Sequence, residues 1–246
     1  MIGGKKILMA AAAAGAAAAS GNDFSAATFK ALWRFEPGNL YADSIGGNTL
    51  QEGTAPDSDA VDFKEGAGCA QFVRENGDFL YIPDIDLDPE FPCKSGETND
   101  DFSIAFWCKF ASIPVTSYLV GKWAFGATGG WMVRLLTSGT IQFSYVRDTG
   151  SWSLLSHTSV LLVGTWYHVG VGFENTNHDY IICIHDTDGN AVGTHKVGTH
   201  WAAMGIAATD FKVGYNMDAR IDEAVHADTK LTAADFQKMA LGTYGS

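Results

Sequence analysis

Residues 101–110 read DFSIAFWCKF and decide the fold, because large apolar residues alternate there with other residues at a period of two. Successive side chains of a β-strand point to opposite faces of the sheet, so one face of this segment is expected to be core. The residues expected on the core face are Phe102, Ile104, Phe106, Cys108 and Phe110, and those on the other face are Ser103, Ala105, Trp107 and Lys109. The segment is therefore predicted to be a strand with one buried face.

The same alternation recurs further along the chain between turn-forming residues. Residues 130–146, GWMVRLLTSGTIQFSYV, predict an antiparallel hairpin in which Gly139 supplies the positive φ of a tight loop. Residues 166–173, WYHVGVGF, alternate again, and residues 179–192 follow with an Asp188-Gly189 turn. The side chains of this second segment that are expected to point inward are Tyr167, Val169, Val171 and Phe173, with Trp166 and His168 pointing outward. We expect an all-β meander of antiparallel strands, which is typical of a β-sandwich.

Only the C-terminal segment, residues 231–242 (LTAADFQKMALG), predicts a helix. Thr232 can cap its first turn, Asp235 completes a capping box, and Leu231 with Phe236 forms a hydrophobic staple. Gly242 is expected to end the helix. The apolar stripe of Phe236, Met239 and Ala240 is sufficient to dock one short helix on the edge of the sandwich.

Length and composition indicate one globular domain. The chain has 246 residues, of which 46% are hydrophobic, and a formal net charge of −12. A polyanion without a long run of Lys and Arg is repelled by phosphate backbones, so nucleic acid is not an expected partner. The cysteines show no CxxC spacing and are interpreted as free thiols rather than as disulfides or zinc ligands; they are Cys69, Cys93, Cys108 and Cys183.

The first 26 residues, MIGGKKILMAAAAAGAAAASGNDFSA, differ in composition from residues 27–246. Lys5 and Lys6, the apolar run 7–19 and the small residues before Ser20 have the order of a secretory signal, and the run is too short to span a bilayer. If the segment is retained, its Ala and Gly side chains offer little surface for independent ordering, and a partner's groove would hold it. We expect either an uncleaved anchor in an oligomeric assembly or a cleaved signal peptide.

Seven short blocks follow one another in a fixed order. They are WRF (33–35), DSIGGN (43–48), DFLYIP (78–83), DFSIAFWCKF (101–110), SGTIQF (138–143), GTWYHVGVGF (164–173) and ARIDEAV (219–225). In this order they resemble the concanavalin A-like lectin/glucanase superfamily, in its laminin G-like branch. The resemblance covers roughly residues 31–241 and implies a jelly roll of two antiparallel sheets with one short C-terminal helix. IHDTDG (184–189) departs from the family pattern and suggests a longer hairpin.

The carboxylates do not form the pattern of a glycanase. The glucanase branch of the resembled family carries an ExDxE run on one strand, and this sequence has none. Asp84, Asp86 and Asp88 lie between two prolines, so we expect a solvated acidic loop rather than a strand or an EF-hand. Asp222 and Glu223 are adjacent and would face opposite sides of their strand. We therefore predict that the protein is not an enzyme.

The resemblance also implies a structural Ca²⁺ that ties the opening loop to the closing strand. The matching oxygen ligands are Asp43, Asn48 and Asp222, with backbone carbonyls completing the shell. The alternative is that Asp43 caps its own turn and Asp222 pairs with a neighbour.

A ligand surface is expected on the side of the strands opposite the core, where flat aromatic rings next to hydrogen-bonding groups suit sugar rings. The candidate ligand-binding residues are Trp107, Lys109, Arg134, Gln142 and His168, with Ser144 and Trp166 beside them. The alternative is that Trp107 and Trp166 only pack, because both fall on framework positions of the resembled family.

Three function classes follow from these observations. The leader and the sandwich together resemble structural proteins of tailed bacteriophages, which implies a non-catalytic lectin-like module on a virion, tail-associated or on the capsid surface, that binds other virion proteins and a host-surface glycan. A secreted bacterial carbohydrate-binding protein is the alternative if the leader is cleaved. A glycanase is disfavoured by the missing carboxylate pair.

Overall fold

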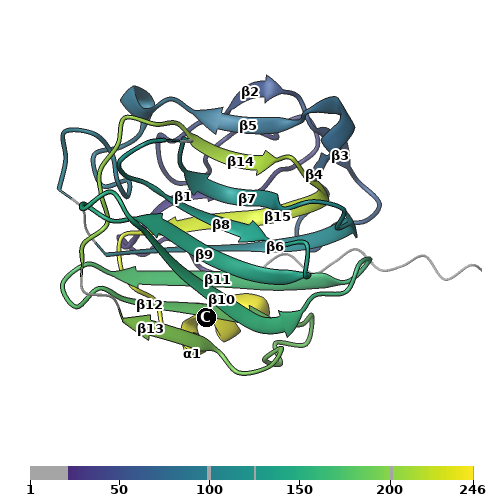
Figure 1. Ribbon diagram of the computed structural model, residues 1–246. Coiled ribbons are helices and arrows are strands. Elements are labelled where there is room, and N and C mark those ends of the chain that lie inside the picture. The colour runs from purple at the N-terminus through teal and green to yellow at the C-terminus, as the bar shows by residue number, and fades with distance from the viewer. Residues whose placement is uncertain (1–21, 99–100, 125, 200–201, 246) are drawn as a thin grey trace, which may run out of the picture.

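Two antiparallel sheets stack face to face in the computed structural model, which describes residues 22–98, 101–124, 126–199 and 202–245 (Figure 1). The front sheet faces the viewer in Figure 1 and has the order β10 (Trp152–Val160), β9 (Thr140–Val146), β8 (Trp131–Leu135), β7 (Ser117–Lys122), β14 (Phe211–Tyr215), β5 (Phe79–Ile82) and β2 (Gln51–Thr54). The back sheet has the order β13 (Lys196–Thr199), β12 (Asp179–His185), β11 (Trp166–Glu174), β6 (Phe102–Ser112), β15 (Asp218–Ala227), β4 (Cys69–Phe72) and β3 (Asp57–Asp59), and β1 (Phe29–Trp33) pairs with β15. The predicted all-β sandwich is confirmed.

The core lies between the sheets and is lined by the residues that the alternation predicted. The inward side chains of β6 and β11 are at most 5% exposed; they are Phe102, Ile104, Phe106, Cys108, Phe110, Tyr167, Val169, Val171 and Phe173. The two strands are paired antiparallel over their whole common length. The predicted facing of both segments is therefore confirmed.

The predicted hairpin is formed by β8 and β9, and Gly139 in its loop has a φ of +79°. β11 and β12 form the second expected antiparallel pair. After β12 the chain turns at Asp188-Gly189, where Asp186 accepts hydrogen bonds from the backbone N–H groups of Asp188 and Asn190. Short 3₁₀ helices at Arg74–Asn76 and Asp84–Asp86 flank β5.

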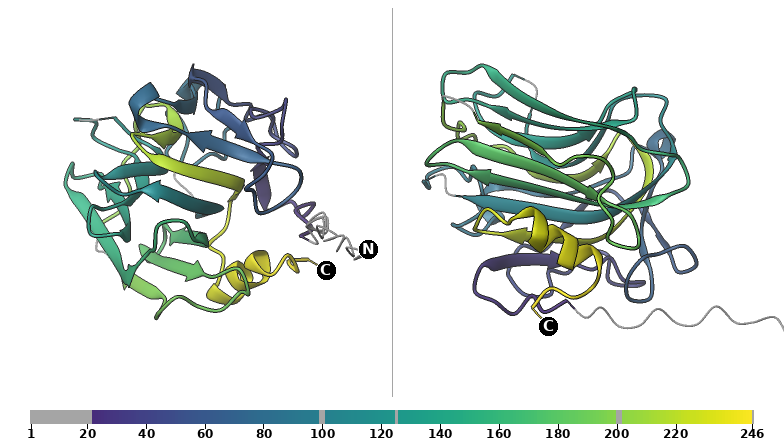
Figure 2. Two further views of the ribbon diagram at one scale, coloured as in Figure 1. Left: turned by 90° about the vertical axis from the view of Figure 1, so that its right-hand side faces the viewer. Right: turned by 90° about the horizontal axis from the view of Figure 1, so that it is seen from below.

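The C-terminal helix α1 spans Ala233–Ala240 and has the predicted capping box between Thr232 and Asp235. It lies on the outer face of the back sheet and not on the edge of the sandwich, on the side away from the front sheet (Figure 2). The position follows from Gly170 in β11, because a Cβ atom there would lie 2.3 Å from the ring of Phe236. The absent side chain lets the helix rest directly on the sheet.

Residues 22–26, which the composition assigns to the leader, contact the end of the chain. The Asp23 N–H donates to the Tyr244 carbonyl at 2.7 Å, and the Tyr244 N–H donates to Asn22 Oδ1 at 2.9 Å. Phe24 is 5% exposed and packs on Phe29 with a ring distance of 5.1 Å. Residues 1–21, and with them the expectations of an anchor or a signal peptide, lie outside the described residues.

The four cysteines are free and buried, as expected. The expectation of a solvated acidic loop at residues 84–88 is wrong, since Asp84 pairs with the fully buried Lys122 at 2.7 Å and Asp88 accepts a hydrogen bond from Asn48 at 2.7 Å. The buried side chains of Lys122 and Asn48 thus reach into that loop from the core side. Within the part of the chain that the structure describes, no helix has the length and hydropathy that a membrane crossing requires.

Candidate functional site

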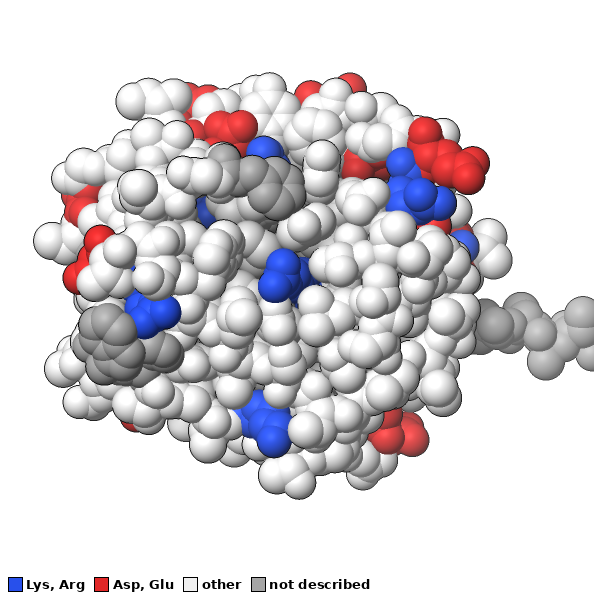
Figure 3. Space-filling view, in the orientation of Figure 1, with Lys and Arg blue, Asp and Glu red and all other residues white. Residues whose placement is uncertain are grey.

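A row of side chains crosses five neighbouring strands on the outer face of the front sheet. Direct cross-strand pairing places these residues side by side, and we call them the front-sheet row; they are Ser156, Gln142, Arg134, Tyr118 and Tyr215. The strand neighbours of Arg134 and Gln142 belong to the core, and Tyr215 is exposed, so the row points away from the core. Figure 3 shows this face: acidic side chains lie along its rim, and basic or uncharged side chains occupy its centre.

One half of the row is a chain of hydrogen bonds between polar side chains. Arg134 donates from Nε and Nη2 to Gln142 Oε1, at 2.8 and 2.5 Å. Gln142 Nε2 in turn donates to Ser156 Oγ at 2.7 Å, and Ser144 Oγ donates to Gln142 Oε1 at 3.2 Å. These bonds orient the guanidinium group, because Gln142 is itself held by two serines and is only 7% exposed.

The other half of the row continues into a band of aromatic rings. Tyr118 stacks on Trp123 with 5.4 Å between ring centroids and lies 5.9 Å from Tyr215. The ring of Phe79 lies 5.9 Å from Tyr215 and 6.0 Å from Tyr81. Tyr215 is 39% exposed, whereas Trp123 is 3% exposed and supports the band from below. The band therefore offers flat apolar surface beside the polar half of the row.

A second basic group accompanies the aromatic band. Lys212 Nζ lies 5.7 Å from the centroid of the Trp123 ring, a distance at which a cation is attracted to the π face. Lys212 pairs in register with Gly121, where a Cβ atom would lie 2.4 Å from the carbonyl oxygen of Trp131.

The other three predicted ligand residues lie on the back sheet, so the structure does not bring the five into one site. Trp107 and His168 face away from the core as expected, but they are only 1% and 3% exposed and their rings lie 5.2 Å apart. Lys64 covers Trp107, with Nζ 4.6 Å from the ring centroid. Lys109 is paired with Asp62 at 2.8 Å. Burial leaves Trp107 and His168 almost no surface for a ligand.

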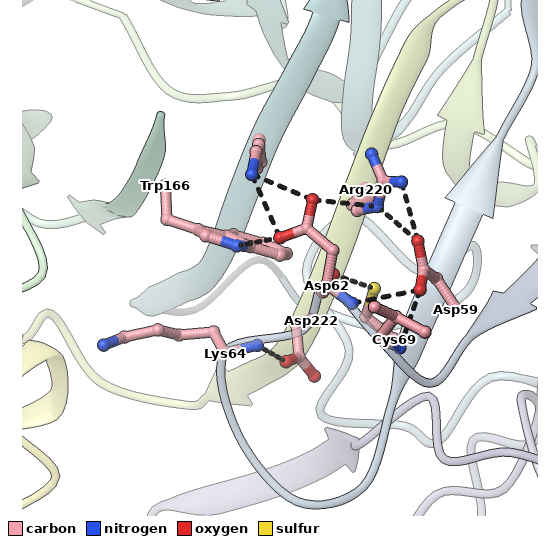
Figure 4. A network of polar contacts seen from close by, with 9 residues as sticks. Asp59, Asp62, Lys64, Cys69, Trp166, Arg220 and Asp222 are labelled. Carbon is pink, nitrogen blue, oxygen red and sulfur yellow. Dashed lines mark hydrogen bonds and ion pairs between the residues drawn. The ribbon is translucent and has the colours of Figure 1, made fainter. Parts of the chain in front are cut away.

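The segment from Asp59 to Lys64 is fastened over the back sheet by a polar network (Figure 4). Asp62 Oδ1 accepts hydrogen bonds from Lys109 Nζ at 3.0 Å and from Trp166 Nε1 at 3.1 Å. Asp59 Oδ2 accepts from Arg220 Nε at 2.8 Å. Burial opposes ionisation of both carboxyls, but backbone N–H donors and Arg220 at Asp59, and Lys109 and the Trp166 indole at Asp62, hold the pKa of each below the usual range. Trp166, a further predicted outer-face residue, is therefore a structural anchor.

Asp222 lies beneath the same segment and is 1% exposed. Its Oδ2 accepts hydrogen bonds from the backbone N–H groups of Lys64 and Glu65, each at 2.8 Å, but its Oδ1 has no partner among the described residues (Figure 4). Burial raises the pKa of Asp222 to about 7, which the two backbone donors only partly offset. The carboxyl is thus close to half protonated at neutral pH.

Three histidines of the back sheet region are buried in their neutral form. Burial lowers the pKa of His168 and of His226 to about 3 each and that of His185 to about 4. Neither ring nitrogen of His226 has a hydrogen-bond partner in the described part of the chain. These side chains add to the packing and carry no charge at neutral pH.

The residues expected to bind calcium do not fit a coordination shell. Asp43 Oδ1 accepts hydrogen bonds from the backbone N–H groups of Leu32, Ile45 and Gly46, and Oδ2 accepts from the N–H of Asn48. These donors occupy the oxygen atoms that a cation would need. Asp222 binds a different segment, and within the described residues no group of three or more His, Cys, Asp or Glu side chains is arranged to hold a metal.

A pocket of about 780 Å³ lies between the β12–β13 edge and residues 229–233. In it Glu174 and Asp179 are directly paired on β11 and β12, and Lys230 Nζ lies 3.2 Å from Glu174 Oε2 and 3.8 Å from Asp179 Oδ2. The Thr199 hydroxyl donates to Asp179 Oδ1 at 2.5 Å. The sequence did not single out this pair, because only the register of two strands brings it together. The ammonium group lies between the two carboxylates and neutralises part of their charge.

Comparison with solved structures shows the same fold in several binding domains. The binding domain of Paraclostridial Mosquitocidal Protein 1 has a TM-score of 0.64 and 13% sequence identity, over 87% of this chain and 52% of that chain. The binding domain of botulinum neurotoxin DC in complex with SialylT has a TM-score of 0.63 and 10% identity, over 89% and 52%. Our chain thus spans about half the length of these toxin domains.

A third similar structure is Domain 4 of AbnA, a GH43 extracellular arabinanase from Geobacillus stearothermophilus, in complex with arabinotriose. It has a TM-score of 0.63 and 15% identity, over 87% of this chain and 98% of that chain. The sequence matches no curated protein. Identities this low show a shared fold and nothing finer.

The sequence itself places the chain in a family. Residues 87–237 match the laminin G-type model of the concanavalin A-like lectin/glucanases superfamily. The match begins in the loop before β6 and runs into α1, so it includes the strands that form most of the front-sheet row. Since it covers more than half of the 246 residues, the chain belongs to the concanavalin A-like lectin/glucanases superfamily, in its laminin G-like branch.

Proposed function

We propose that the protein is a non-catalytic carbohydrate-binding module and that its binding surface is the front-sheet row with the aromatic band beside it. One observation carries the proposal: exposed rings continue directly into an oriented set of hydrogen-bonding side chains. Sugar rings have apolar faces and polar edges, so the band would take the faces and Arg134 the hydroxyl groups.

The comparisons support a binding role in the same fold. One similar domain was solved in complex with arabinotriose and another in complex with SialylT. Binding domains of toxins are also among the similar structures. A lectin-like module is therefore the function that fits both the family and the surface.

The decisive experiment screens the protein on a glycan array and then measures the best ligand by calorimetry with variants of Tyr215. Tyr215→Ala removes the most exposed ring of the row and should weaken binding by about 1 kcal/mol, roughly fivefold in Kd. Tyr215→Phe keeps the ring and should bind within about twofold of wild type. Val61→Ala, in the exposed part of the segment over the back sheet, serves as the control for general effects of surface truncation.

Two results would contradict the proposal. One is a protein that binds no glycan on the array although it is folded by circular dichroism. The other is a glycan ligand whose affinity is unchanged in Tyr215→Ala, because the binding surface would then lie elsewhere.

The pocket beside Lys230 favours a second candidate function, the hydrolysis of a glycoside by Glu174 and Asp179. Paired carboxylates on neighbouring strands are the groups such a reaction uses. The ammonium group of Lys230 stands between them, where the reacting oxygen would have to sit. Release of reducing sugar by wild type that is abolished in Glu174→Gln would establish this function in place of the first.

The virion role expected from the sequence stays a prediction, as does its secreted alternative. We propose that intact mass of the native protein separates them, because retention of Met1 excludes signal-peptide cleavage and a new terminus near Ala19 supports secretion.

A further inference from the structure

The front-sheet row contains an arginine that has no acidic partner. Several cationic side chains of this protein are paired with carboxylates, as Lys122 is with Asp84 and Arg220 is with Asp59. Arg134 forms no ion pair with any carboxylate of the described residues, and its only side-chain partner there is the neutral Gln142. In a chain with a net charge of −12, an unpaired arginine at the centre of a sheet face is unexpected.

The side chains around Arg134 keep its guanidinium group oriented and leave its charge uncompensated. Nε and one N–H of Nη2 bind Gln142, so the N–H groups of Nη1 have no partner in the described part of the chain. The neighbours of Arg134 within the row are Gln142 on one side and Tyr118 on the other, and both are neutral. The guanidinium group of Arg134 is therefore already oriented, so ligand binding would lose little further side-chain entropy.

A second cation without an ion pair lies at the other end of the aromatic band. Lys212 Nζ stands over the Trp123 ring and pairs with no carboxylate of the described ranges. Tyr118 pairs with Arg134 on the neighbouring strand and stacks on Trp123, the ring that Lys212 covers. Adjacent strands are about 4.8 Å apart, so Arg134 and Tyr215 are separated by roughly 10 Å, the span of a disaccharide.

We propose that this surface binds an acidic glycan, that Arg134 binds its carboxylate or sulfate group, and that Lys212 makes a second cationic contact. This inference rests on the proposed function and adds the chemical class of the sugar. A guanidinium group offers parallel N–H donors that match the oxygen atoms of a carboxylate or a sulfate. The net negative charge of the protein repels anions in general, so a preference for acidic sugars can come only from local groups such as these.

The test compares matched pairs of ligands that differ only in charge. One pair is an oligogalacturonide and the same oligosaccharide with its carboxyl groups reduced to alcohols. The other is a chondroitin sulfate oligosaccharide and its desulfated form. Wild type should bind the acidic member of at least one pair about tenfold or more tightly than its neutral or less acidic counterpart, and the pair that shows the difference identifies carboxylate or sulfate as the bound group.

Three variants assign the preference to the row. Arg134→Gln should lose most of the tenfold preference while it keeps the weaker binding of the neutral sugar. Arg134→Lys retains the charge without the planar fork and should keep part of the preference. Lys238→Gln removes an exposed basic group on α1, on the outer face of the back sheet, and should behave as wild type. Melting temperatures of all variants check that each one folds.

The outcomes separate this inference from the function on which it rests. Equal affinity for the acidic and neutral members of both pairs would overturn the acidic-glycan inference and leave a neutral carbohydrate module standing. An acidic preference that survives in Arg134→Gln would overturn the role of Arg134. Absence of binding to any sugar of either charge would remove the proposed function itself.

Discussion

The opposite pKa shifts of Asp222 and of the buried histidines predict a free energy of unfolding that rises steeply with pH up to about 6.5 and levels off above about pH 7. His168, His185 and His226 have folded-state pKa values far below 6.5, so unfolding takes up protons at these side chains when the pH is below that value. Asp222 has a pKa of about 7 in the fold and 3.8 in the unfolded chain. At a pH between these two values, Asp222 therefore releases a proton when the protein unfolds. Stability contributed by the histidines is therefore lost as the pH falls, and stability contributed by Asp222 is lost as the pH rises.

The magnitude follows from the number of protons. Between about pH 5 and 6 the three histidines take up roughly three protons on unfolding and Asp222 releases one, so about two are taken up in total and the free energy of unfolding should rise by roughly 2.7 kcal/mol per pH unit. His157, whose pKa burial also lowers, acts in the same direction. Between about pH 6.5 and 7.5 the proton uptake by the histidines of the unfolded chain and the proton release by Asp222 nearly cancel, so the free energy of unfolding should change by less than about 1 kcal/mol.

The substitution Asp222→Asn isolates the carboxyl, because its amide oxygen can still accept the N–H bonds of Lys64 and Glu65. Urea unfolding followed by tryptophan fluorescence should show a steeper slope below pH 6, of roughly 4 kcal/mol per pH unit, and a further rise of about 1 kcal/mol between pH 6.5 and 7.5. Asp188→Asn, at an exposed turn, is the control and should keep the wild-type profile. Parallel wild-type and Asp222→Asn profiles between pH 5 and 7 would refute the reasoning, since they would mean that Asp222 is ionised in the fold at every pH tested.

Three further substitutions test packing and capping by the same unfolding assay. Phe173→Ala removes a fully buried ring that lies 5.3 Å from the ring of Tyr145 and should cost about 3–5 kcal/mol, with a smaller loss in Phe173→Leu; a loss below about 1 kcal/mol would contradict the core assignment. Gly170→Ala places a Cβ atom 2.3 Å from the Phe236 ring and should cost about 1–3 kcal/mol with faster amide exchange in α1, whereas unchanged exchange would show that the helix does not rest there. Thr232→Ala removes the helix cap and should cost about 1 kcal/mol, and a neutral result would mean that the capping box adds nothing in solution.

Elements whose signals are local were predictable from the sequence. The alternation of β6 and β11 places every inward side chain correctly, because a strand with one buried face has a strict period of two. The cap of α1 was predictable for the same reason, since Thr232 and Asp235 are three residues apart. Alternation cannot tell, however, whether a further layer covers the outer face. The segment at Lys64 comes from elsewhere in the chain and buries Trp107, which the pattern alone left exposed.

Only half of the candidate site could be predicted from the sequence, for a related reason. Arg134 and Gln142 belong to one hairpin, so their placement on one face follows from a short stretch of chain. Tyr118 and Tyr215 meet only because β14 inserts between β7 and β5, and this order of strands has no local signature. The ion pair of Lys122 with Asp84 was missed likewise, because a lysine in an apolar strand gives no sign of which loop will supply its carboxylate.

The hydrogen bonds between Asn22, Asp23 and Tyr244 determine on which side of the domain a tether can be attached. Both points of the chain lie together on the side of the back sheet, next to α1 and Phe24 (Figure 2). A tether fused at either point therefore leads away from the front sheet, and the row of Arg134 and Tyr215 is presented on the opposite side, free of the support. A biosensor surface attached next to residue 22 or residue 244, or a larger polypeptide joined there, would leave the outer face of the front sheet exposed.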